Sequence, residues 1–215
     1  MSSRIPFRAI VLALVVAIPA WAGEPRDLIA SNARRAVQRA RESGGSGAAS
    51  VDKMRTVFVE QMEPLFDYRE LTMRTLGVHA RKYSEAEVKA LTGVFRDFLR
   101  QLFRSTLLPK NTFQNLERVD VTDELIRGRY ARVATVAMVR RENKPETLPV
   151  VYLLVNTRDK KWSIYDMEID GYSIVSNYRA QFDAVLKNKP LAELMKILGE
   201  KTRNLVKENT AGSSH

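Results

Sequence analysis

Apolar residues recur every three or four positions over much of the first half of the chain, a pattern that predicts amphipathic helices. Two such stripes cover residues 25–42 and 51–62, and Pro64 then interrupts the second. A shorter helix is expected over residues 65–76, because Gly77 is typical of the position that follows a helix.

The most regular helical pattern begins at Ser84. Ser84 and Glu87 form an S-x-x-E capping box, in which each side chain accepts a backbone N–H at the start of a helix. From Val88 a broad apolar stripe continues, and we expect the helix to end near Pro109. The stripe consists of Leu91, Val94, Phe95, Phe98, Leu99, Leu102 and Phe103.

After this helix the pattern changes to that of β-strands. Four segments rich in Val, Tyr, Ile and Thr are separated by short polar turns. They cover residues 113–121, 128–140, 148–156 and 161–170. Such turns predict a four-stranded antiparallel sheet in meander order. Because residues 150–155 are apolar at consecutive positions, we expect both faces of the sheet to be covered there.

Gly171 marks a sharp corner after the last strand, and the helical pattern then returns. Apolar residues between Ile174 and Leu186 form one stripe, and Pro190 starts a final helix. Residues 209–215 are expected to form a disordered tail. The pattern as a whole predicts an α+β fold, with a twisted antiparallel sheet packed against several helices.

The first 22 residues have the layout of a secretory signal peptide. Arg4 and Arg8 precede an apolar run over residues 9–20, and Ala-Trp-Ala at 20–22 fits an A-x-A cleavage site. The run is shorter than the roughly 20 residues that a membrane-spanning helix needs. We therefore expect export and removal of residues 1–22, leaving a single domain over 23–208; an uncleaved membrane anchor is the alternative.

The charge of the chain points to anionic partners. Lysine and arginine number 35 against 25 acidic residues, a formal net charge of +10, of which the signal peptide contributes two charges. For an exported protein, anionic lipid headgroups or acidic protein faces are better partners than nucleic acid, although the charge could serve solubility alone. Cysteine is absent, so disulfides and thiolate metal sites are excluded.

Little in the sequence indicates catalysis. The chain has two histidines and lacks the G-x-S-x-G, H-E-x-x-H, P-loop and G-x-G-x-x-G motifs. The best catalytic candidates are Asp166, Glu168 and Asp170, which share one face of the last predicted strand and could pair their carboxylates or hold a hard metal. The alternative is a solvated face neutralised by basic residues. His79 as a metal ligand has no histidine partner.

Three segments carry a more specific pattern. LFDYRELTMRTLG occupies residues 65–77, an apolar helix covers 95–108, and WSIYDMEIDGYSIVSNYR at 162–179 fits W-x-x-Y-D-x-x-x-x-G-x-S-x-x-x-x-Y-R. In these segments the chain resembles the MlaC family of periplasmic phospholipid carriers, and the resemblance covers nearly all of the mature chain. It departs at Tyr172, where the family has a smaller aliphatic residue.

This resemblance implies a fold and a function. The sheet and helices would enclose an apolar cavity that takes the acyl chains of a phospholipid and uses no cofactor, metal or covalent chemistry. The protein would move phospholipid across the periplasm between an outer-membrane lipoprotein complex and an inner-membrane ABC transporter with an MCE-type ring. Outer-membrane lipid asymmetry and toluene tolerance are the processes linked with the family. A hopanoid or another terpenoid lipid is an alternative ligand.

We expect the lipid to contact the glycine corner, the inward face of the strands and one helix. The candidate lipid-binding residues are Leu99, Leu102, Phe103, Val150, Tyr152, Leu154, Tyr165, Met167, Ile169, Tyr172 and Ile174, each of which could equally fill a core. Two further functions stay open. An enzyme would use Asp166 or Asp170 beside Tyr165 or Tyr172 as an acid and base pair, and a basic interaction module would bind an acidic partner.

Overall fold

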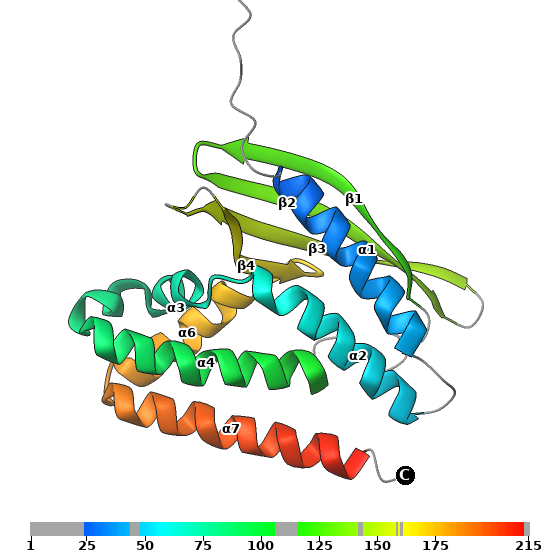
Figure 1. Cartoon of the computed structure of the whole chain (residues 1–215). Helices are drawn as coiled ribbons and strands as arrows, with labels where there is room; N and C mark the ends of the chain where they lie inside the picture. Colours follow the sequence, from blue (N-terminus) through cyan, green and yellow to red (C-terminus); the bar gives the residue numbers. More distant parts are fainter. Residues whose placement is uncertain are drawn as a thin grey trace, which may run out of the picture.

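The computed structural model describes residues 24–43, 48–105, 116–141, 144–157, 159 and 161–212, and shows helices stacked on one antiparallel sheet (Figure 1). The predicted signal peptide, residues 1–22, lies outside the described residues. Within the part that is described, none of the helices is long and apolar enough to cross a membrane.

The N-terminal helices follow the sequence pattern. α1 spans Pro25–Ser43 and α2 spans Ala48–Met62. Pro64 then ends the α-helical geometry, and Glu63–Leu65 form a short 3-10 turn, η1. α3 covers Tyr68–Leu76, where the side chain of Asp67 accepts the backbone N–H of Glu70 at 2.9 Å as an N-cap. The 3-10 helix η2, Gly77–Lys82, follows.

The remaining helices pack beneath the sheet. α4 spans Glu85–Ser105, and its predicted capping box is confirmed, since Ser84 N donates to Glu87 Oε2 at 2.8 Å and Glu87 N to Ser84 Oγ at 3.3 Å. α6 spans Ile174–Leu186 and α7 spans Leu191–Gly212. α7 runs along α4 on the side away from the sheet (Figure 1). It extends to Gly212 and so overlaps the first residues of the predicted tail, 209–215.

The sheet has five antiparallel strands in the order β1-β2-β3-β4-β5. β1 spans Leu116–Arg127, β2 Tyr130–Arg141, β3 Lys144–Asn156, β4 Trp162–Ile169 and β5 Tyr172–Ser173. The predicted meander is confirmed, and the two-residue β5 extends the expected four strands by one. Asp170 and Gly171 form the turn before β5 with φ values of 49° and 81°, as in a type I′ hairpin.

One face of the sheet is packed against the helices, and we call it the inner face. Its buried side chains include Val133, Thr135 and Ala137 on β2 and Val150, Tyr152 and Leu154 on β3. Val151 and Leu153 point to the opposite, outer face and are half-buried, so the expectation that both faces are covered holds only in part.

The main hydrophobic core joins the inner face to α3, α4, α6 and α7. At its centre, Phe95 lies 4.9 Å from the ring of Phe182 and 5.4 Å from that of Tyr178, measured between ring centroids. A second, smaller cluster attaches α1 to the sheet through Val37 and Val139. The two clusters meet where α2 faces the sheet, since Met62 and Val150 belong to the main core and Ala137 to the smaller cluster.

Candidate functional site

An apolar pocket lies between α2, η1, the end of α4 and the inner face of the sheet. The helical side contributes Phe58, Val59, Met62, Glu63, Phe66, Tyr68 and Phe103. The sheet contributes Leu116, Val119, Thr135, Ala137, Leu148, Val150, Tyr152, Met167 and Ile169. Pro64 lies in the short turn η1 that follows α2 beside the pocket, and Glu63 of this turn is part of the lining.

The pocket is small and extends across the sheet, since residues of β1, β2, β3 and β4 all line it. Its cavity volume is about 80 Å³. Ligand pockets typically measure roughly 300–1,000 Å³ and are mostly apolar. In this structure the pocket is therefore smaller than a typical ligand site and its walls would have to separate to admit a whole acyl chain, while its apolar lining suits an apolar ligand.

Few polar groups reach the pocket, and most of them are already engaged. The hydroxyl of Thr135 donates to the carbonyl oxygen of Val150 at 2.9 Å. Burial raises the pKa of Tyr152 well above its ordinary value, and burial followed by the negative charge of Glu63 does the same for Tyr68. Both tyrosines thus stay neutral at physiological pH, so the pocket wall carries no charge from them.

Glu63 is the only charged residue among the described residues that line the pocket. Arg100 of α4 donates through Nε to both carboxylate oxygens, at 3.1 and 3.0 Å, and its Nη2 also contacts Oε1. The Arg100 side chain is 38% exposed and that of Glu63 is 19% exposed, so the ion pair connects the pocket with the surface.

Five of the eleven residues proposed to contact lipid line this pocket. They are Phe103, Val150, Tyr152, Met167 and Ile169. Ile169 is shared with a second, more open groove beside the glycine corner, which also includes Leu102, Tyr172 and Ile174. The Tyr172 side chain is 79% exposed there, so it does not reduce the width of the first pocket.

The other three predicted residues lie elsewhere. Leu99 and Leu154 are fully buried in the main core. Tyr165 is displaced by a β-bulge in β4, where Leu153 pairs with Asp166 and Leu154 with Ile164. Ile164 therefore takes the inner-face position expected for Tyr165.

The displaced Tyr165 side chain lies outside the pocket, against a basic residue of α3. Its ring lies 3.9 Å from the guanidinium carbon of Arg74 and 6.1 Å from the ring of Tyr130. A cation held over an aromatic face at this distance stabilises the packing of α3 against the sheet.

Sequence reasoning missed most of the remaining lining. Phe58 and Met62 fall on the predicted apolar stripe of residues 51–62 but were not among the candidate lipid-binding residues, and the inward residues of β1 and β2 were not selected either. Thr135, Ala137 and Val139 alternate with outward residues on β2, so strand periodicity could have indicated this wall of the pocket. Which helix covers it could not be read from the pattern.

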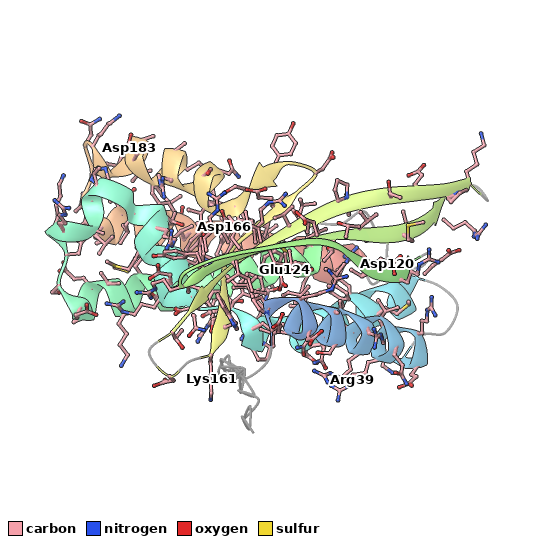
Figure 2. All side chains as sticks on the ribbon, turned by 90° about the horizontal axis from the view of Figure 1, so that it is seen from above. Arg39, Asp120, Glu124, Lys161, Asp166 and Asp183 are labelled. Carbon is pink, nitrogen blue, oxygen red and sulfur yellow. The ribbon has the colours of Figure 1, made fainter. Side chains whose placement is uncertain are left out.

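The carboxylates proposed for catalysis are not paired with one another. Asp166 lies in the middle of the molecule (Figure 2) and is 4% exposed. It accepts hydrogen bonds from Met167 N at 2.8 Å, Val175 N at 3.0 Å and Ser173 Oγ at 2.6 Å. These contacts make it the anchor between β4 and the start of α6, while Asp170 is exposed in the turn.

The candidate metal ligand His79 also has a structural contact. Its Nε2 lies 2.9 Å from Asp183 Oδ1, and the pKa of Asp183 is lowered by Lys187 first and by His79 second. Across the residues the structure describes, no group of three or more His, Cys, Asp or Glu side chains is placed to hold a metal ion.

The basic residues of α1 mainly hold that helix in place. Arg41 donates to the carbonyl oxygens of Leu116, at 3.3 Å, and Glu117. Arg39 donates to Gln61 of α2 at 2.9 Å from the outer side of α1 (Figure 2). The geometry gives these arginines roles in packing, and it brings neither of them to the pocket.

Two comparisons with known proteins agree with this architecture. The family model described as MlaC protein matches residues 30–200. The fold is similar to the solved structure of a phospholipid-binding protein from Ralstonia solanacearum in complex with a phospholipid. That similarity has a TM-score of 0.65 at 16% identity and covers 86% of this chain and 99% of the other. Among curated proteins, none matches the chain significantly.

Proposed function

This chain belongs to the MlaC family, and from that membership we propose that it binds phospholipid acyl chains in the pocket between α2 and the sheet and carries the lipid through the periplasm. The observation that carries the proposal is the pocket itself. Its lining is almost entirely apolar, with Glu63 as the one charged residue among the described residues that form it. The phospholipid held by the Ralstonia solanacearum protein of the same fold supports the choice of ligand.

The physical need for such a carrier follows from the cost of exposing acyl chains to water. On the order of 30 methylene groups at ~0.8 kcal/mol each would cost roughly 24 kcal/mol, so free diffusion of the lipid is negligible. A pocket about as apolar as the bilayer makes transfer nearly neutral. The direction of transport must then come from partners that bind the loaded and empty forms differently.

We propose as partners an outer-membrane lipoprotein complex and an inner-membrane ABC transporter complex with an MCE-type ring. The net positive charge of the chain is compatible with acidic partner faces and anionic membrane surfaces. No part of this route requires chemistry on the lipid. In keeping with this, Asp166 accepts hydrogen bonds that join β4 to the start of α6, and Asp170 is exposed in the turn beside it.

The first test is native mass spectrometry of the exported protein, purified without detergent from a Gram-negative periplasm. A bound mass that solvent extraction identifies as phospholipid is the expected result, and an extracted terpenoid would instead support the alternative ligand. A ligand-free mass that takes up no added phospholipid would overturn the proposal.

The same spectra test the proposed export. Removal of residues 1–22 predicts a chain that begins at Gly23. Detection of the full chain in the membrane fraction would instead support an uncleaved anchor.

A further inference from the structure

The ion pair between Glu63 and Arg100 is the charged boundary of the pocket among the residues that the structure describes. Glu63 comes from the kink after α2 and Arg100 from the middle of α4, so the pair bridges the two helical walls. Because Arg100 reaches solvent while Glu63 lines the apolar space, the pair lies where a lipid in the pocket would present its polar end.

The charged side chains next to this ion pair neutralise each other. Arg96 of α4 is paired with its neighbour Asp97, at 3.0 Å between Nη2 and Oδ1. The hydroxyl of Tyr68 lies within electrostatic reach of both Glu63 and Arg100, and burial keeps it protonated and able to donate. A headgroup arriving here would therefore meet one cation and one anion that are bonded to each other, with a neutral donor beside them.

We propose that the Glu63–Arg100 pair selects a phospholipid whose headgroup carries both a phosphate and an ammonium group over one that carries only the phosphate. This inference rests on the proposed function. The guanidinium of Arg100 would exchange the carboxylate for the phosphate, which it can bind through two parallel N–H donors. The ammonium would then take the place of Arg100 at Glu63.

The selectivity follows from counting opposite charges before and after the exchange. With a zwitterionic headgroup, Arg100 pairs with the phosphate and Glu63 pairs with the ammonium, so neither protein charge is left without a partner. With an anionic headgroup, Arg100 gains the phosphate but Glu63 loses its partner, and a largely buried carboxylate without a partner is strongly disfavoured. The discrimination arises from the unpaired charge in the wrong complex as well as from the contacts in the right one.

The test measures lipid uptake by delipidated full-length mature protein from vesicles of equal phosphatidylethanolamine and phosphatidylglycerol with identical acyl chains. Extracted lipid should be enriched about two- to fivefold in the zwitterionic species. The Glu63→Gln variant should lose or invert this enrichment, because Arg100 is then free to attract the anionic headgroup. Arg100→Gln should take up less lipid in total and keep the zwitterionic preference.

Matched controls use the surface pair Arg69–Glu85, whose side chains are 54% and 79% exposed and outside the pocket lining. Arg69→Gln and Glu85→Gln change the net charge equally and should leave both load and headgroup ratio unchanged. Wild-type enrichment that Glu63→Gln retains, or no enrichment in the wild type, would overturn the inference while leaving the carrier proposal intact. A wild type that takes up no phospholipid would overturn both.

Discussion

Filling the pocket from the sheet side should expel the acyl chains without unfolding the protein. Ala137 lies on β2, and its partners across the strands, Val119 and Leu148, also line the pocket. The Ala137→Phe substitution would project a phenyl ring into the narrow space between them. The ring would occupy the space of about four to six acyl carbons.

At ~0.8 kcal/mol for each buried methylene, this displacement should weaken phospholipid binding by about 3–5 kcal/mol. Since 1.4 kcal/mol corresponds to a factor of ten, the dissociation constant should rise roughly a hundredfold to several thousandfold. Stability should change little, because strain of about 1–3 kcal/mol from the larger side chain is offset by burial of its ring.

The assay is equilibrium uptake of phospholipid from vesicles by delipidated protein, accompanied by thermal unfolding of each variant. Ala134→Phe is the matched control, since it places the same ring three residues away on the outer face of β2, where Ala134 is half-buried. The control should bind lipid like the wild type. If folded Ala137→Phe protein carries the wild-type load, the acyl chains do not occupy this pocket.

Two further predictions concern the structure around the pocket. Asp166→Ala would leave three donors without their acceptor and should lower the free energy of unfolding by about 3–5 kcal/mol in denaturant titrations. Glu168 is half-buried, so the control Glu168→Ala should lower it by less than about 1 kcal/mol. Equal losses in the two variants would contradict the anchoring role of Asp166. Burial raises the pKa of Tyr178 to about 12, so the folded state favours the neutral form and stability should be lost as pH rises from about 10 to about 12. Tyr178→Phe, which cannot ionise, should lose less over that interval, and an identical loss would refute this contribution.

Local features of the fold were predictable because their causes lie within a few residues. The capping box of Ser84 and Glu87 starts α4, Pro64 ends α2, and Gly171 allows the positive φ of the turn before β5. The capping box satisfies backbone donors, the proline lacks an N–H, and the glycine has no side chain to restrict φ, so the cause lies in each case within a few residues. The meander order followed for the same reason, since its turns are short.

Features that depend on partners distant in sequence were not predictable from the pattern. The bulge at Tyr165 depends on how β4 pairs with β3, and it exchanges the expected inward side chain for Ile164. Glu63 and Arg100 are 37 residues apart, and nothing in the spacing indicates that they pair at the edge of a pocket. The carboxylate row failed as a candidate because α6 supplies donors to Asp166 alone.

The sequence by itself determined the α+β class, the helices and strands, and the absence of motifs for the common catalytic chemistries, because periodicity and turn residues act locally. Only the tertiary structure decided which apolar residues fill a core and which line a space. The residues of both groups have the same period and the same hydrophobicity, so the pattern cannot separate them. Ala137 and Phe58 show how closely the two roles lie, because they pack in one buried cluster and also line the pocket that the proposed lipid would occupy.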